Sequence, residues 1–181
     1  LVSRAIVGDH LFPGKYTEAQ AMRFRRVGAR NFLRLDRPEH AGMMLMGDCG
    51  AFSYSTSEVP PYAVDDTVEF YADAGFTHGC SIDHIIFEFD PAAKGTEGGS
   101  QIARDRFDIT LELAQHFFRA SRELGDGFIP IGVVQGWSPG SMTEAAHSLL
   151  AMGYRYLAIG GLVPLRTETI HQAVDAVDAA V

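Results

Sequence analysis

Short apolar runs and amphipathic segments alternate along most of the chain. The apolar runs predict buried β-strands at about residues 43–46, 79–87, 128–134 and 154–159. The segments that follow them carry apolar residues at helical spacing and predict helices at about residues 64–74, 102–124, 141–153 and from 167 onward. Strands that are apolar along their whole length are typical of a parallel sheet with both faces covered. The order of elements therefore predicts the α/β class.

The ends of these helices carry signals of their own. Gly75 follows the first helix, where a glycine takes the left-handed conformation at little energetic cost. The Ser-Met-Thr-Glu sequence at 141–144 is typical of a capping box at a helix N-terminus. The first 40 residues are less regular, and there we expect a helix at 17–30 and a further strand at 5–7.

Two architectures fit this alternation, an open doubly wound sheet and a (β/α)8 TIM-type barrel. The chain contains no GxGxxG or GxxxxGK[ST] fingerprint of a nucleotide-binding fold. Periodicity alone does not separate the two, and we expect a single domain over residues 1–181. In the barrel interpretation that domain is incomplete, because eight strand–helix units need a longer chain.

Composition narrows the class of protein further. The chain has 181 residues, of which 46% are hydrophobic, and a formal charge of −8, as in an ordinary globular domain. No apolar run is long enough to span a membrane and no signal peptide opens the chain, so we expect no membrane partner. Two cysteines, Cys49 and Cys80, are too few for a disulfide framework or a four-ligand zinc site, which predicts a reduced, cytoplasmic setting. The first residue is Leu1 and not Met, and the last residue, Val181, lies within a helical pattern. We therefore expect the chain to be part of a longer gene product.

The acidic balance argues against a broad nucleic-acid-binding surface, but it allows a deep pocket that holds one extruded nucleotide. A basic rim for such a pocket is available from five arginines, Arg23, Arg25, Arg26, Arg30 and Arg34. The alternative is that these arginines form the solvated face of a helix, and we favour that interpretation.

Each predicted strand meets a polar or glycine residue near its carboxyl end. These residues are Asp48, Asp83, Gln135 and the pair Gly160-Gly161. In barrel enzymes the active site is built at that end of the strands, so we expect the four positions to converge on one pocket. A carboxylate and an amide can read the polar edge of a guanine-like base. A second carboxylate can transfer a proton or attack a sugar carbon.

Each of these residues also has a purely structural interpretation. Asp48 can bond its own backbone in a turn, and Gln135 can be a satisfied buried amide. Gly160-Gly161 can be a plain turn or the phosphate-binding turn common in barrels. For Asp83 a functional role is favoured, because a carboxylate inside an apolar strand needs a partner.

Three neighbouring side chains have structural alternatives as well. Phe52 can belong to the core, Trp137 can cover a loop, and His84 is more often packed or hydrogen-bonded than a catalytic base. The expected convergence of the strand ends therefore carries more weight than any single residue.

Several of these segments resemble the tRNA-guanine transglycosylases and their DNA-acting relatives. Residues 48–52 (Asp-Cys-Gly-Ala-Phe) resemble the family's Asp-Ser-Gly-Gly-Phe, and residues 132–136 (Gly-Val-Val-Gln-Gly) its Gly-Ile-Val-Gln-Gly. Residues 158–162 (Ala-Ile-Gly-Gly-Leu) match its Ala-Ile-Gly-Gly-Leu turn. The interval from Gly75 to Asp83 has the family's spacing between a helix-ending glycine and the base-recognising aspartate. These segments occur in family order across about residues 43–165.

The resemblance implies roles for the residues that match. Asp48 contacts the base and acts as acid and base, Phe52 stacks on the base, and Asp83 and Gln135 read its polar edge. Backbone contacts and the rest of the binding set come from Gly136, Gly160, Gly161 and Leu162. The family exchanges bases by a ping-pong route in which an aspartate attacks the ribose C1′, guanine leaves and a 7-deazaguanine replaces it. The implied partners are the base and an extruded nucleotide of DNA or tRNA.

Departures from the family pattern bear on the substrate. Ser53 stands where the family usually has Gln, Ala51 where it has Gly, and Trp137 where Gly is common. The sequences at 81–84 (Ser-Ile-Asp-His) and 135–139 (Gln-Gly-Trp-Ser-Pro) are more similar to the DNA-modifying branch, which inserts 7-cyano-7-deazaguanine. The queuine-type exchange in tRNA is the alternative. The resemblance places the family nucleophile and the ligands of its structural zinc beyond Val181, so we expect no cofactor within residues 1–181.

Two other functions remain open at this point. One is a small-molecule barrel enzyme that binds a phosphate at Gly160-Gly161, and the other is a non-catalytic base-binding paralogue or subunit. An incomplete barrel also exposes a sheet edge, through which we expect the isolated chain to form a homodimer or to aggregate.

Overall fold

The sheet has five parallel strands that lie side by side in sequence order, β1-β2-β3-β4-β5. A computed structural model of the chain describes residues 1–8 and 13–181. Its strands are β1 (Val2–Ser3), β2 (Met46–Asp48), β3 (His78–Cys80), β4 (Ile129–Val134) and β5 (Leu157–Ile159). A doubly wound sheet reverses its strand order at a switch point, and no reversal occurs among the described strands. The α/β class is therefore confirmed, and the described strands contain no switch point of the kind that a doubly wound sheet has.

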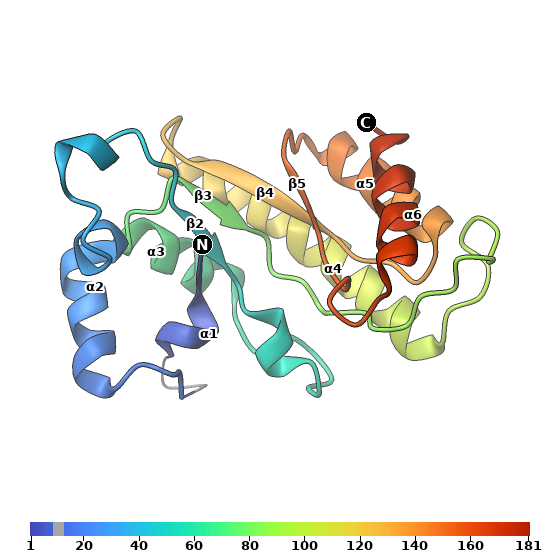
Figure 1. The fold of residues 1–181 in the computed structure, drawn as a ribbon, viewed down its shortest axis with the longest axis horizontal. Coiled ribbons are helices and arrows are strands. Elements are labelled where there is room, and N and C mark those ends of the chain that lie inside the picture. The colour runs from blue at the N-terminus through green and yellow to red at the C-terminus, as the bar shows by residue number, and fades with distance from the viewer. Residues whose placement is uncertain (9–12) are drawn as a thin grey trace.

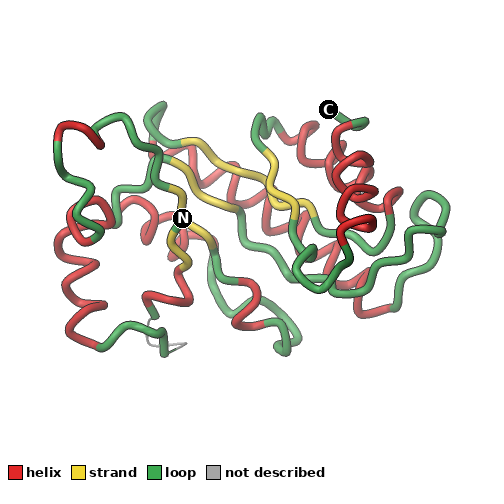
Figure 2. Tube along the Cα trace, in the orientation of Figure 1, coloured by secondary structure: helices red, strands yellow, loops and turns green. Residues whose placement is uncertain are grey.

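Six α-helices accompany the strands in the described part of the chain (Figure 2). They are α1 (Arg4–Val7), α2 (Glu18–Phe32), α3 (Val64–Asp73), α4 (Gln101–Ala120), α5 (Pro139–Met152) and α6 (Thr167–Asp178). Short 3-10 helices lie at Pro38–His40, Ala51–Tyr54 and Ser121–Leu124. Neighbouring helices from α3 to α6 pack against one another in chain order, and α4 runs behind β3 and β4 (Figure 1).

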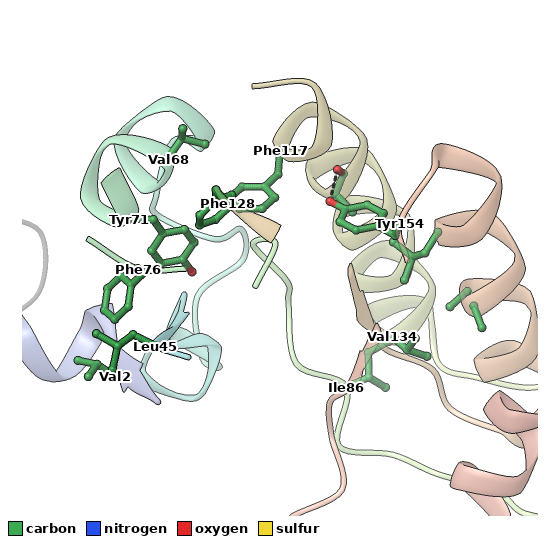
Figure 3. Packing of buried hydrophobic residues seen from close by; sticks show 14 of the residues in the cluster. Val2, Leu45, Val68, Tyr71, Phe76, Ile86, Phe117, Phe128, Val134 and Tyr154 are labelled. Atoms are coloured by element: carbon green, nitrogen blue, oxygen red, sulfur yellow. Dashed lines mark hydrogen bonds between the residues drawn. The ribbon is translucent and has the colours of Figure 1, made fainter. Parts of the chain in front are cut away.

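The main core lies between the sheet and these helices. Tyr71 of α3 is fully buried among Phe76, Phe117 and Phe128, and its hydroxyl donates to the carbonyl of Cys80 at 3.0 Å (Figure 3). Two strand glycines make this packing close, because a Cβ at Gly47 or Gly79 would overlap the Tyr71 ring. Glycine usually weakens a strand, and here its absent side chain leaves space for an aromatic ring.

Several helix predictions are confirmed, with their capping chemistry. Helix α3 is followed by Gly75 at φ 68°, and α5 ends at Gly153 at φ 109°. The predicted helix at 17–30 is α2, which Thr17 caps by accepting from the Gln20 amide, and Gly28 kinks it at φ 75°. The predicted capping box at 141–144 is wrong. Helix α5 begins at Pro139, because the Ser138 hydroxyl accepts from the Ser141 amide at 3.1 Å.

The strand predictions were right in place. The strand expected at 128–134 is confirmed as β4, whereas the other three differ from the structure in extent. The strand expected at 43–46 pairs at Met46–Asp48, and the one expected at 154–159 pairs at Leu157–Ile159. The strand expected at 79–87 pairs only at His78–Cys80. The Ser81 amide still donates to the carbonyl of Ile131 in β4 at 2.8 Å. Farther along, backbone amides bond to side chains: His84 donates to Thr110 Oγ1 and Ile86 donates to Gln135 Oε1. The apolar run at 79–87 thus indicates that the segment is buried, but it does not distinguish a strand from an irregular buried segment.

The prediction of a strand at 5–7 is wrong. Residues Arg4–Val7 form the short helix α1, and the preceding Val2–Ser3 pairs with β2. Three apolar residues are too few to show a period of two or of 3.6. Across residues 1–8 and 13–181, no helix has the length and apolar character needed to cross a membrane.

Candidate functional site

A pocket of about 490 Å³ opens at the carboxyl ends of the strands. Among the residues that line it are most of the site residues predicted from the sequence: Asp48, Phe52, Asp83, Gln135, Gly160, Gly161 and Leu162. These residues come from four different strand ends, and the parallel arrangement brings those ends to one edge of the sheet. The expectation that the four strand-end positions converge on one pocket is confirmed.

The alternation of side chains along β4 explains which residues reach the pocket. Gly132 and Val134 face the helices, where Gly132 lies against Leu149. Ile131 and Val133 face the opposite side, and Val133 lines the pocket. Since side chains in a strand alternate between faces, Gln135 follows Val133 on the pocket side. A Gln one position earlier would have pointed into the helix layer.

Asp83 is the most deeply buried carboxyl group of the site, with 4% of its surface exposed. Its Oδ1 accepts a hydrogen bond from Cys49 Sγ at 3.0 Å, and its Oδ2 accepts from Gln135 Nε2 at 2.6 Å. Burial raises the pKa of Asp83 to about 6, although both hydrogen bonds favour the ionised form. The nearby charge of Asp48 also raises this pKa.

The orientation of Gln135 is determined by its partners. Its Oε1 accepts from the backbone amide of Ile86 at 3.1 Å, so its Nε2 group must point to Asp83. Gly160 and Gly161 make room for this amide, because a Cβ at Gly160 would overlap Gln135 Nε2. A Cβ at Gly161 would lie 2.6 Å from the carbonyl oxygen of Ile86, at a φ of 74° that other residues rarely adopt. The two glycines thus allow the β5 turn to approach the pair.

Asp48 ends β2 and lies beside Ser3 of the neighbouring strand β1. Burial raises the pKa of Asp48, while hydrogen bonds from the Ser3 side chain and the Gly50 backbone lower it in part. Gly50 takes φ 88°, and a Cβ there would lie 2.5 Å from the Cβ of Ala5. Asp48 is therefore a partly desolvated carboxyl group at the pocket wall, and the turn interpretation also holds because the Gly50 amide bonds to it.

Phe52 lies in the 3-10 helix after β2, and 64% of its surface is exposed. The interpretation of Phe52 as a core residue is wrong. Its ring meets the half-exposed ring of Phe87 edge to face, with centroids 6.0 Å apart, which limits its orientations. A flat face at the pocket mouth is thereby available for a ring to stack on.

Several candidates of the sequence analysis lie away from the pocket. Gly136 lies under α5, where a Cβ would come within 2.8 Å of Ser141 Oγ. His84 is buried, and its Nε2 lies 2.9 Å from the carbonyl oxygen of Ser57. Trp137 covers the 95–99 loop and bonds to the carbonyl of Glu97 at 3.1 Å. The structural interpretations of His84 and Trp137 are confirmed.

The arginines form no rim around this pocket. Arg30 donates to the backbone carbonyls of His40 and Met43, at 2.6 and 2.7 Å, and Arg25 donates to that of Gly8. Within the described residues, none of the five arginines lines the pocket, and Lys15 supplies the cationic group there. The sequence pattern contained no signal for Lys15, because it stands alone in an irregular segment.

Sequence reasoning also missed the residues that support Asp83. The Tyr54 hydroxyl lies 3.2 Å from Cys49 Sγ and 3.0 Å from the carbonyl oxygen of Asp83. Both Cys49 and Tyr54 are completely buried. Cys49 directly follows Asp48 at the end of β2, but nothing in the sequence pattern links Cys49 or Tyr54 to Asp83, so only their proximity in space identifies them.

The arrangement can recognise a flat heterocycle that donates hydrogen bonds. Each oxygen of Asp83 has accepted one bond and can accept another, and Gln135 Nε2 has a second hydrogen to donate. The pocket wall behind them is apolar, with Met46, Cys80, Val133 and Ala158 on the same face of the sheet. In this surrounding of low polarity, an unpaired donor or acceptor on the ligand is costly, which favours selection.

Comparison with known proteins identifies a protein of similar sequence. No protein-family model matches the chain. It is 43% identical over 180 residues to a DNA-guanine transglycosylase from Salmonella montevideo, and the alignment covers 98% of this chain. The chain spans 42% of that relative, less than half of its length. An identity of this level along nearly the whole chain confirms the resemblance seen in the short motifs. Over nearly its whole length the chain is therefore similar to part of a DNA-guanine transglycosylase, and this similarity supports its membership of the guanine transglycosylase superfamily.

Proposed function

We propose that the protein to which this chain belongs exchanges a guanine base in DNA for a 7-deazaguanine. The observation that carries this proposal is the buried pair of Asp83 and Gln135 at the floor of a pocket whose mouth presents Phe52. An aromatic face for stacking and a carboxylate–amide pair for the polar edge are the two elements needed to hold an extruded purine. The protein acts as a pentosyltransferase.

Each lining residue has a role in this proposal. Phe52 stacks on the base, Asp83 accepts its ring N–H and exocyclic amine protons, and Gln135 donates to its carbonyl oxygen. The backbone at Gly160, Gly161 and Leu162 provides further polar contacts. Lys15 at the pocket wall attracts a phosphate of the extruded nucleotide.

Asp48 acts as the acid and base for the two bases that exchange. Burial raises its pKa, which favours a carboxyl group that can pass a proton to the departing guanine and take one from the incoming base. The carboxylate that attacks C1′ belongs to another part of the protein in this proposal, beyond β5 and α6.

Support for DNA and for 7-cyano-7-deazaguanine comes from two observations. The relative at 43% identity is a DNA-guanine transglycosylase, and the sequences at 135–139 and 81–84 resemble the DNA-modifying branch, which inserts 7-cyano-7-deazaguanine. Exchange in tRNA is the alternative outcome of the experiment that follows.

The sheet also supports an incomplete (β/α)8 barrel. Five parallel strands in sequence order carry their helices on one face, and the other face presents Met46, Ile131 and Ala158. In a barrel that second face becomes the interior.

Binding of a phosphate at the glycine pair is less favoured. The Gly160 amide donates to the carbonyl of Val134 at 2.9 Å, so it is already used in the sheet. A phosphate-binding turn needs several free backbone amides.

Base binding by purified variants tests the proposal. We expect Asp83→Ala and Gln135→Ala to weaken binding of 7-cyano-7-deazaguanine by about 10- to 100-fold, the effect of one or two hydrogen bonds that involve a charged group. Asp108→Asn, an exposed carboxyl on α4, is the matched control and should bind as the wild type does. In the full-length protein, Asp48→Asn should abolish exchange of labelled guanine in DNA.

Two results would contradict the proposal. One is undiminished base binding in both pocket variants. The other is tight binding of a phosphorylated metabolite together with no binding of any 7-deazaguanine. Exchange in tRNA and not in DNA would reassign the nucleic acid while leaving the base site intact.

A further inference from the structure

We propose that Cys49, with Tyr54 behind it, is a positioning residue that fixes the orientation and the charge of the Asp83 carboxyl group. The inference rests on the proposed function in one respect only, the role of the Asp83 carboxylate in binding the base. Its basis is a chain of buried hydrogen bonds that runs from Tyr54 through Cys49 to Asp83 and on to Gln135.

The two oxygens of Asp83 have different partners from opposite sides. The Cys49 thiol donates to Oδ1 at 3.0 Å from the segment after β2, and Gln135 donates to Oδ2 at 2.6 Å from the end of β4. With one donor on each oxygen, rotation of the carboxyl group would break both bonds. The remaining lone pairs are thereby held in fixed directions, as recognition of a rigid heterocycle requires.

Tyr54 holds the thiol in turn. Its hydroxyl lies 3.2 Å from Cys49 Sγ and 3.0 Å from the carbonyl oxygen of Asp83, so its one proton is shared between two acceptors of the same network. The Tyr54 ring is packed edge to face against Tyr62 and His84. A sulfur that accepts from Tyr54 is left with its own hydrogen for Asp83.

Burial makes both groups permanent donors. Desolvation raises the pKa of the Cys49 thiol well above its usual range, and the charges of Asp83 and Asp48 raise it further. Desolvation likewise raises the pKa of Tyr54. Neither group therefore becomes an anion near neutral pH, so Cys49 cannot serve as a nucleophile and acts through Asp83.

The hydrogen bonds of this network offset part of the pKa increase that desolvation causes at Asp83. Burial and the charge of Asp48 raise the pKa of Asp83, whereas the bonds from Cys49 and Gln135 lower it. The polar and titratable groups packed around this carboxyl are Asp48, Cys49, Tyr54, Tyr71, Cys80 and Gln135. Loss of the thiol donor should therefore raise the pKa of Asp83 above about 6 and leave less of it ionised at neutral pH.

The direct test is the titration of Asp83 in the ligand-free protein, followed by NMR of carboxyl groups labelled at Cγ. We expect the midpoint to move upward in Cys49→Ala and to return towards the wild-type value in Cys49→Ser, which restores a donor. Tyr54→Phe should give a smaller shift in the same direction. Ile82→Val is the matched control, because it removes packing from the same buried cluster without removing a donor, and its midpoint should not move.

Base binding gives the second readout. At pH 6, Cys49→Ala should bind 7-cyano-7-deazaguanine roughly fivefold more weakly than wild type, the effect of one ordinary hydrogen bond. The difference should become smaller at pH 8, where Asp83 is ionised in both proteins, and the difference that remains reports the orientation of the carboxyl group.

The possible outcomes separate the two proposals. An unchanged midpoint in Cys49→Ala, or equal shifts in Cys49→Ala, Cys49→Ser and Ile82→Val, would show that Cys49 contributes packing alone and would overturn the inference. If the midpoint shifts as expected but no 7-deazaguanine binds at either pH, the positioning role stands and the proposed function fails. If Cys49→Ala destabilises the fold too strongly, the comparison of Tyr54→Phe with Ile82→Val decides.

Discussion

At the scale of single residues, the site depends on how strongly the fold desolvates a carboxyl group. Asp83 exposes only 4% of its surface, and two donated hydrogen bonds offset only part of the cost of burying its charge. The same burial that makes the group selective for a ligand makes the ionised form unfavourable in the free protein. Function and stability therefore oppose each other at this residue.

The raised pKa of Asp83 predicts that the free energy of unfolding depends on pH. The pKa of Asp83 is about 6 in the folded protein against 3.8 for an ordinary Asp, so the folded state holds a proton that the unfolded state has released between these values. Protonation of Asp83 stabilises the folded state fully below about pH 4. This stabilisation is lost as the pH rises through 6, which lowers the free energy of unfolding by roughly 3 kcal/mol. Urea unfolding at several pH values should show a less steep fall over this window in Asp83→Asn than in wild type. Equal slopes in the two proteins would contradict the shifted pKa.

Phe52 is the opposite case, an exposed residue with no evident structural need. Phe52→Ala should change the free energy of unfolding by no more than about 0.5 kcal/mol, as at an ordinary surface position. Loss of a stacking face should weaken base binding by about 1–3 kcal/mol. Calorimetric titration of Phe52→Ala and of Phe52→Trp checks this, with affinity expected to recover in the Trp variant. A large loss of stability in Phe52→Ala would instead assign the ring to the fold.

At the scale of elements, glycines decide how closely the layers approach. Gly47 and Gly79 accept the Tyr71 ring on the helix side of the sheet, and Gly160 accepts the Gln135 amide on the pocket side. In each case the glycine lacks a Cβ, and the side chain of a neighbouring residue occupies the space that a Cβ would take. The position of the site thus depends on missing side chains as much as on present ones.

Gly160→Ala tests this at the pocket. The new Cβ would overlap Gln135 Nε2, and Gln135 would have to leave its bond to Asp83 or the β5 turn would have to move. We expect a loss of stability of about 1–3 kcal/mol and loss of base binding. Gly127→Ala is the control, since a Cβ there has open space, and thermal unfolding with base titration measures both effects. A Gly160→Ala protein with wild-type base affinity would refute the dependence of Gln135 on this glycine.

At the scale of the whole molecule, one sheet separates two environments. Helices α3 to α6 cover one face with a large apolar core, whereas the other face carries a smaller cluster that includes Cys80, Ile131 and Val133. The edge strands of the described sheet are β1 and β5. An edge strand with unpaired backbone groups is a ready partner for another chain.

We therefore expect a protein limited to residues 1–181 to self-associate. Light scattering coupled to gel filtration should show a mass that rises above 19.7 kDa with concentration. The full-length protein serves as the comparison: if the proposed barrel pairs both edges, its mass should not rise with concentration. A strictly monomeric 181-residue protein at millimolar concentration would argue against exposed, pairing-competent edges.

The class of the fold, the order of its elements and the strand ends that carry polar groups could all be predicted from the amino-acid sequence. These predictions were possible because apolar periodicity and glycine stops are local signals, and because parallel strands place their carboxyl ends at one edge. Three features depend on the tertiary structure. Residues 82–87 leave the ladder, Val2–Ser3 and not residues 5–7 pairs with β2, and Cys49 and Tyr54 support Asp83. Those features depend on bonds between residues distant in the chain, such as Ile86 to Gln135, and no local pattern encodes such a bond.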